Sequence, residues 1–413
     1  MAVLLEELDL TTLKRGRPIV ASKIDVTQVY NEAGPAVVDL PANARNWELI
    51  QLDDNGDLVP FGLVLTWNDV VEVPLLVEDW DWKQALDDQG QQTETLTLLG
   101  TDFLVLLANR VAYPNPLLAW TSQTVASVTY GPDPAETVIK DIVTANVVSP
   151  GDTARAVSVL SVATDQERGG TATYKVVTPD PDAESGTENT TVAASLMDMV
   201  RAVDEQAPIG VQITLGDGEL VFDCYEPRDL SEAAVFSATL GNFPEGSLTV
   251  AAPTANAILA QSKVSGANFT QSEGTGADDP WRRVEQFADQ SSTDTAADVT
   301  TAVNQALAAG ASRINISAQV VDLPRLRFGA DGPGVQGYQV GDIVALDIRE
   351  GVTFTDIVSK VQLVADATGD TYTETVTPTI GTATDDAADQ TISSKLSARL
   401  RALERALRGS ATP

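Results

Sequence analysis

The sequence contains no histidine. Histidine is the commonest general base and the commonest metal ligand, and its charge changes near neutral pH. Its absence excludes Ser-His-Asp hydrolases, histidine-ligated zinc sites and histidine proton shuttles. Chemistry that uses only carboxylates or lysine stays open. We therefore expect a protein that is not an enzyme and that has no catalytic residue, no cofactor and no obligatory metal ion.

Cysteine is nearly absent as well, since Cys224 is the only one, and an intramolecular disulfide is thus excluded. Cys224 lies in an alternating apolar pattern, which favours a buried structural thiol over a reactive one. Long apolar runs are also missing, because none approaches the roughly 20 residues that span a bilayer. The N-terminal run 2–18 is too short and too charged for a secretory signal. We expect a soluble protein that is made and first assembled in a cytosol.

Basic residues are scarce: 26 Lys and Arg stand against 59 Asp and Glu, which gives a net charge of −33. Binding of DNA through its phosphates needs clustered Lys and Arg, so this composition argues against a DNA-binding protein. A strongly acidic surface favours solubility and repels other polyanions. Proteins of halophiles share this composition, so an acidic surface or binding protein of a halophile stays an alternative.

The chain is long enough to form several hydrophobic cores. It has 413 residues, of which 43% are hydrophobic. Single cores seldom grow beyond ~250–300 residues, so we expect two to four domains. Short runs with alternating apolar residues outnumber segments with helical spacing. The sequence therefore predicts an α+β protein that is mainly β.

The run WELIQL from Trp47 and the run LVPFGLVLTW from Leu58 predict two strands. They flank the acidic segment 53–57, in which Asn55-Gly56 is typical of a hairpin turn. An acidic loop could also suggest calcium. The EF-hand spacing, however, requires glycine where Leu58 stands, so we predict a plain turn.

Four segments have the apolar spacing and the capping residues of helices. These predicted helices cover residues 103–110, 134–146, 192–203 and 295–309.

The segment 210–224 predicts a hairpin, with Gly216-Asp217-Gly218 as its turn, and 343–348 and 354–364 predict two further strands. The polar segments 178–189 and 266–280 predict surface loops.

The C-terminal run ISSKLSARLRALERALRG predicts a helix over about 391–408. Its leucines are spaced like the seam of a short coiled coil, and the run is locally basic. Two heptads are too short to be stable alone in water, so the helix should associate with other subunits or with a neighbouring protein. The alternative is that it folds back onto its own subunit as an amphipathic helix. The predicted oligomer interface consists of Leu396, Leu400, Leu403 and Leu407.

Several motifs in one collinear order give the chain a family resemblance. They are GTDFLVLLANRVAYP from Gly100, PAETVIKDIVTANV from Pro134, EPRDLSEAAVFSATLGNFPEG from Glu226, APTANAILAQ from Ala252, PWRRVEQFAD from Pro280, YQVGDIVAL from Tyr338 and TPTIG from Thr377. With these motifs the chain resembles the minor tail, or baseplate hub, proteins of long-tailed phages (siphoviruses) that infect actinobacteria. It departs from that family at Gln261–Ser265, where relatives often have a glycine-rich stretch.

The resemblance implies tube-forming β-barrel hub domains, an inserted α+β domain and a C-terminal helix. The implied domains are a first barrel at 1–125, completed by about 228–265, an inserted α+β domain at 126–227, a second barrel at 266–385 and a coiled-coil-like helix at 386–413. It also implies a homotrimer at the tail tip, in which three subunits with two barrels each form a ring.

The resemblance implies a structural role in the virion. The ring would adapt the tail tube to the tip proteins and line the channel through which viral DNA leaves without being specifically bound. The implied partners are the distal tail protein, the tape measure protein and tip or fibre proteins. A tail-associated cell-wall or polysaccharide hydrolase is the enzymatic alternative, because glycoside hydrolysis needs only paired carboxylates.

Overall fold

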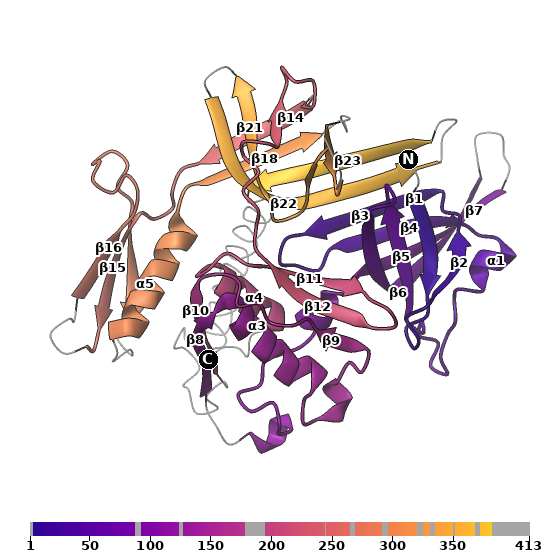
Figure 1. Cartoon of the computed structure of the whole chain (residues 1–413), viewed down its shortest axis with the longest axis horizontal. Helices are drawn as coiled ribbons and strands as arrows, with labels where there is room; N and C mark the ends of the chain where they lie inside the picture. The colour runs from indigo at the N-terminus through magenta and orange to yellow at the C-terminus, as the bar shows by residue number, and fades with distance from the viewer. Residues whose placement is uncertain are drawn as a thin grey trace, which may run out of the picture. The chain divides into compact units, whose positions relative to one another are not determined.

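A computed structural model describes residues 3–86, 92–123, 127–177, 195–243, 245–264, 269–290, 296–319, 325–330, 335–349, 352–367 and 372–381. The chain forms two compact units (Figure 1). Unit 1 comprises residues 1–244 and 319–378, and unit 2 comprises residues 245–318 and 379–413.

Unit 1 is built on a large antiparallel sheet with the strand order β22-β3-β4-β7-β6-β5-β1-β2. Its strands are β1 (Val3–Leu8), β2 (Arg15–Ile19), β3 (Lys23–Val29), β4 (Pro35–Pro41), β5 (Phe61–Trp67), β6 (Val71–Leu86), β7 (Gln92–Asp102) and β22 (Val352–Asp366). Beside β22 lies β21 (Ile343–Arg349), which also pairs in parallel with β13 (Val235–Ser237). The short strands β19 (Leu326–Phe328) and β20 (Gln336–Tyr338) form a separate parallel pair.

Alternating apolar residues bury one face of this sheet. In β4, for example, Ala36, Val38 and Leu40 are buried while the residues between them are exposed or half-buried, as the two-residue period of a strand requires. Equivalent positions on the other strands complete the core. They include Leu5, Val26, Leu65, Trp67, Leu75, Leu96, Leu98, Val361 and Leu363.

The sheet is open within the described residues, because no strand pairing there joins β2 to β22. This differs from the closed barrel that the family resemblance implied for the first domain. Edge strand β2 contains Pro18, which has no N–H to donate and is typical of sheet edges.

A smaller α+β region lies between residues 127 and 225 of unit 1. It consists of β8 (Ser127–Pro134), α3 (Ala135–Val143) with a π-helical turn (Thr144–Val148), β9 (Leu160–Val162), β10 (Thr171–Val177), α4 (Leu196–Asp204), β11 (Gly210–Leu215) and β12 (Leu220–Tyr225). Strands β8 and β10 form one sheet, and β11, β12 and β9 form another in that order. Unit 1 also contains the short helix α2 (Val105–Ala108) and two 3₁₀ turns, at Trp120–Ser122 and Thr153–Arg155.

The two main helices of this region pack on each other and share one apolar core. Helix α3 buries Val138, Ile142 and Val143, which lie on one stripe. Helix α4 begins at Ser195, whose Oγ accepts a hydrogen bond from the Asp198 N–H while the Asp198 carboxylate accepts one from the Ser195 N–H. This reciprocal capping fixes the start of the helix.

Unit 2 has a three-stranded sheet covered on one face by a helix. Strand β15 (Ala257–Ser262) is central, antiparallel to β16 (Phe269–Glu273) and parallel to β17 (Glu285–Gln290). Helix α5 (Ala296–Gly310) packs through Val299 and Val303 against Ile258 and Ala260 of β15. The unit also contains β14 (Glu245–Ala251) and β18 (Arg313–Gln319), and β18 pairs with the end of β23 (Thr373–Gly381).

Most of the predicted secondary structure is confirmed. Strands β11 and β12 form the hairpin predicted at 210–224, and β21 and β22 match the two strands predicted near the C-terminal end of unit 1. Helices α3, α4 and α5 match three of the four predicted helices. The buried thiol of Cys224 is confirmed as well.

Three predictions of local structure are wrong. The run from Trp47 contains no strand, because α1 (Ala44–Trp47) and a turn occupy it, and the Asn43 side chain caps that helix. The predicted turn after it is present, with Gly56 donating its N–H to the Asp53 carbonyl. The helix predicted at 103–110 shrinks to the single turn of α2, and part of the loop predicted at 266–280 is strand β16. The predicted loop 178–189 lies outside the described residues.

Candidate functional site

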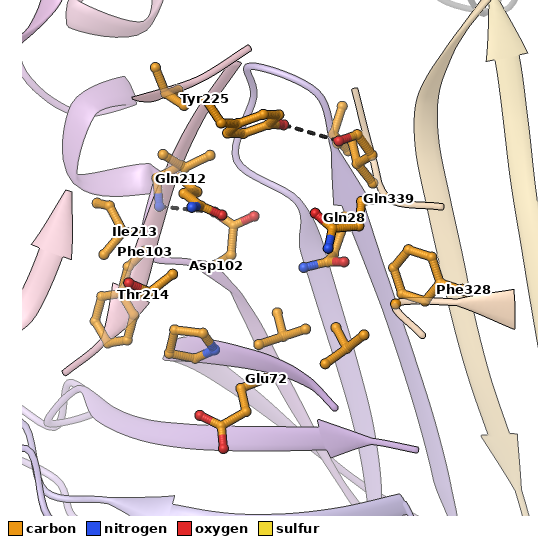
Figure 2. Close-up of a pocket in the computed structure, with 18 of the residues that line it drawn as sticks. Gln28, Glu72, Asp102, Phe103, Gln212, Ile213, Thr214, Tyr225, Phe328 and Gln339 are labelled. Atoms are coloured by element: carbon orange, nitrogen blue, oxygen red, sulfur yellow. Dashed lines mark hydrogen bonds between the residues drawn. The ribbon is translucent and has the colours of Figure 1, made fainter. Parts of the chain in front are cut away.

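A cavity of about 260 Å³ opens in unit 1 beside the end of β7 (Figure 2). Four pieces of the chain line it. They are the end of β3, the start of β6 with the turn before it, residues 102–104, and β11, joined by Tyr225, Phe328, Gly329, Gln339 and Val340. The lining mixes aliphatic side chains with amides and carboxylates. Such a mixture is typical of a site that binds a ligand through a few placed polar groups.

Asp102 is the central polar residue of this cavity (Figure 2). It ends β7, and its two carboxylate oxygens accept hydrogen bonds from the backbone N–H groups of Gly34 and Leu104, each at 2.9 Å. Burial raises the pKa of Asp102 to about 6, although these two hydrogen bonds act to lower it. No Lys or Arg pairs with Asp102 within the described residues.

Of the other polar groups in the cavity, some form ion pairs or hydrogen bonds and are called engaged, and the others are called unengaged. Glu72 forms an ion pair of 2.5 Å with Arg15, and the Tyr225 hydroxyl donates to the Val340 carbonyl at 3.1 Å. The unengaged groups are side-chain amides, which have no hydrogen bond to another described residue. They belong to Gln28, Gln212 and Gln339. Among the described residues that line the cavity, Asp102 has no second unpaired acid or base beside it.

A second cluster of charges lies in the α+β region and is buried. Glu136 and Lys140 of α3 meet Arg168 and Asp223, and the ion-pair distances range from 2.6 to 2.8 Å. Burial alone raises the pKa of Glu136, but hydrogen bonds from Arg168 and Lys140 outweigh it and lower the pKa to about 2. Because every carboxylate here is paired with a cation, the cluster holds together α3, β12 and the loop that contains Arg168, between β9 and β10.

Unit 2 exposes aromatic side chains on the sheet face that α5 leaves uncovered. Ile258 and Ala260 face α5, so Leu259 between them faces the other way. Phe287 is opposite Leu259 in the register, and Phe269 is opposite Gln261, two residues further along β15. Phe269 is 77% exposed and Phe287 is 60% exposed. We call Leu259, Phe269 and Phe287 the aromatic face.

Ion pairs of one arginine lie beside the aromatic face. Arg283 binds Glu273 at 2.6 Å and Glu285 at 2.7 Å, and both carboxylates are opposite Ala257, which shares the side of Leu259. Trp281 just before β17 is 94% exposed. Exposed aromatic groups with a polar rim mark surfaces that bind other proteins.

The predicted interface leucines Leu396, Leu400, Leu403 and Leu407 lie outside the described residues, so their association stays a prediction. Sequence patterns assigned no functional role to Asp102 or to residues 281–287. Within the described ranges, no Cys, Asp and Glu side chains gather in a group that could hold a metal ion. In the same part of the chain, no helix has the length and apolar character needed to cross a membrane.

Comparison with known proteins gives a family and a fold. The family model described as Siphovirus ReqiPepy6 Gp37-like protein matches residues 9–382. The structure is similar to the 43 kDa tail protein of prophage MuSo2 from Shewanella oneidensis, with a TM-score of 0.51 and 10% identity over 92% of this chain and 97% of that one. It is equally similar to the tail protein from Neisseria meningitidis MC58, with a TM-score of 0.51 and 11% identity over the same shares. At these identities the similarity concerns the fold. No curated protein sequence matches the chain.

Proposed function

The chain belongs to the family of Siphovirus ReqiPepy6 Gp37-like proteins, and from this premise we propose that it is a structural, non-enzymatic protein of a phage tail, located in the virion. The observation that carries the proposal is the family match over most of the chain. It is supported by the fold, which this chain shares over 92% of its length with two tail proteins.

In the finer form of the proposal, the protein is the baseplate hub, or minor tail protein, at the tail tip. It assembles as a homotrimer whose ring joins the tail tube to the distal tail protein, the tape measure protein and tip or fibre proteins. Two features of the surface support assembly. Unit 2 exposes the aromatic face. In the part of the chain that the structure describes, the sheet of unit 1 ends in β2, whose outer edge has no neighbouring strand and could pair with another subunit.

The charge of the chain supports a channel role. A net charge of −33 leaves the protein repulsive toward phosphate groups. Lys and Arg side chains in a basic channel would bind the phosphates of passing viral DNA, because this binding releases counterions from the DNA. An acidic channel does not bind the phosphates and lets the DNA pass. We propose that acidic residues line the axis of the ring and that DNA is not specifically bound.

We propose the domain bounds expected from the sequence, with tube-forming domains at 1–125, completed by about 228–265, and at 266–385, an insertion at 126–227 and a terminal helix at 386–413. Helices α3 and α4 and the β11–β12 hairpin share one apolar core, which also includes Leu8, Val64 and Phe103 of the first domain. The four terminal leucines are proposed to contribute to the trimer interface.

The hydrolase alternative receives no support from the carboxylates of the described sites. Glycoside hydrolysis requires one carboxylic acid and one free carboxylate across a substrate. Glu136 and Asp223 are both paired with cations, and Glu72 is paired beside Asp102. Turbidity of host cell walls should stay constant when purified protein is added, and a steady fall would restore the enzymatic alternative.

The proposed trimer is tested by the mass of the purified full-length protein in solution. Sedimentation at micromolar concentration should give three times the chain mass of 43.6 kDa. A monomer under these conditions would contradict the homotrimer. The halophile alternative is tested by circular dichroism at low salt, where a salt-dependent fold should unravel and a tail protein should stay folded.

A further inference from the structure

We propose that the cavity at Asp102 binds an extended peptide segment of a partner protein, with the peptide lying along β11 and a Lys or Arg side chain reaching Asp102. The cavity contains three things that such a ligand needs. They are unpaired strand edges, unengaged amides and a carboxylate without a cation (Figure 2).

The first strand edge belongs to β11, the terminal strand of its sheet. The Val211 N–H donates to the Asn31 Oδ1 atom at 2.9 Å and therefore faces away from β12. Ile213 lies two residues further along, so its N–H and C=O face the same way. Ile213 lines the cavity. An added strand would pair with its outward N–H and C=O groups.

The second edge belongs to the start of β6. The register between β6 and β7 begins at Leu75 opposite Asp102. Among the residues that the structure describes, the preceding residues Val71–Pro74 pair only with β5, which leaves one of their edges without a neighbouring strand. Pro74 has no N–H and fits a strand position that lacks a neighbour. A peptide that enters here adds a strand, which is an established mode of peptide recognition.

The charge of the cavity determines which peptide side chain would bind there. Asp102 and Glu72 are the charged residues among those that line it, and Glu72 is already bound to Arg15. A Lys or Arg of the peptide would give Asp102 the cation that it lacks, and the amides of Gln28, Gln212 and Gln339 could bind the peptide backbone. A divalent metal ion is less suited, because it needs several oxygen ligands and Asp102 offers the free carboxylate alone.

The experiment uses the full-length protein and a fluorescein-labelled peptide of alternating Thr and Val with one central Lys. A second peptide has norleucine in place of that Lys. In fluorescence anisotropy at low ionic strength, the Lys peptide should bind saturably and at least tenfold more tightly than the norleucine peptide. Binding should also slow hydrogen exchange at the Ile213 amide.

Two variants test whether the peptide binds in the cavity, and a third variant is the control. Asp102→Asn removes the charge, and Gln339→Arg places a permanent cation in the cavity at an exposed position. Both should lose at least tenfold in affinity, whereas Glu48→Gln, an exposed carboxylate outside the cavity, should bind like the unmodified protein. Equal binding of the two peptides, no saturation below millimolar concentration, or unchanged affinity in Gln339→Arg would each overturn the proposal.

Discussion

Glu136 and Lys140 form an ion pair of 2.6 Å, one helical turn apart on α3, and neither side chain is more than 4% exposed. A buried pair of this kind is costly to break, because the remaining charge stays in the interior without compensation. Arg168 and Asp223 extend the pair into a cluster that joins elements distant in sequence. The cluster therefore provides a sensitive test of how the α+β region is held together.

Replacing Glu136 with Gln should lower the free energy of unfolding by about 3 kcal/mol, because Lys140 and Arg168 would lose one of the two carboxylates that they share and would keep only Asp223. Urea unfolding followed by tryptophan fluorescence measures the change. Glu48→Gln is the matched control, since Glu48 pairs with Arg17 at the surface. That variant should change stability by about 1 kcal/mol or less. Similar losses in both variants would contradict the importance of the buried cluster.

The same carboxylate predicts a loss of stability in acid. The pKa of Glu136 is lowered to about 2 from 4.5, so its stabilising contribution is fully present above pH 4.5. The contribution should disappear as the pH falls from 4.5 to 2. Unfolding curves across this range should show a steeper acid dependence in the unmodified protein than in Glu136→Gln. Parallel curves would show that Glu136 is not the titrating group.

Asp102 predicts an opposite pH dependence of the free energy of unfolding, at higher pH than that of Glu136. Its pKa is raised to about 6 from 3.8, so the folded protein holds this proton more firmly than the unfolded chain. Its contribution to stability is present below pH 3.8 and is lost as the pH rises through 6. Burial also raises the pKa of Asp204 and Asp356, so Asp102→Asn should reduce the slope between pH 4 and 7 rather than remove it. An unchanged slope in that variant would be evidence against the raised pKa.

The terminal leucines predict an effect on assembly. Changing Leu400 and Leu403 together to Asp should convert trimers to smaller species without loss of fold, because it places charges in the apolar seam. The paired change of Ala398 and Ala402 to Asp is the control, since these positions lie off the seam. Light scattering gives the mass, and circular dichroism reports the fold. An unchanged mass with a lower melting temperature would favour a helix folded back onto its own subunit.

The aromatic face predicts a second effect on assembly. Changing Phe269 and Phe287 to Ser should weaken self-association while leaving unit 2 folded, because both rings are mostly exposed. Sedimentation over a range of concentrations measures the effect. Ser substitution of Phe236, which is fully buried in unit 1, should instead lower the melting temperature. If the surface variant keeps the affinity of the unmodified protein, the aromatic face is not a contact between copies.

Local patterns predicted those elements whose structure depends on neighbours in sequence. The alternation in 210–224 is enough to specify the hairpin of β11 and β12, because its turn and its pairing are local. The run from Trp47 misled because a short apolar run fits a strand and a helical turn equally well. There the deciding contact is distant: the Trp47 ring packs edge-on against Trp80 of β6, at 5.7 Å between centroids.

The candidate sites were less predictable because they assemble residues from distant segments. The spacing of Glu136 and Lys140 is visible in the sequence, but nothing local indicates that Arg168 and Asp223 join them. Asp102 directly precedes the helix predicted at 103–110, and it accepts a hydrogen bond from the Leu104 N–H. Its cavity exists only because β6 and β11 lie beside it, which is a consequence of register and topology.

Immunogold electron microscopy of intact virions, with antibodies against this chain, shows directly whether the protein is a hub at the tail tip. We expect gold at the distal end of the tail, where a hub joins the tube to the tip proteins. Gold confined to the capsid, gold spread along the whole tube, or virions without gold while the protein is present in the lysate would contradict it.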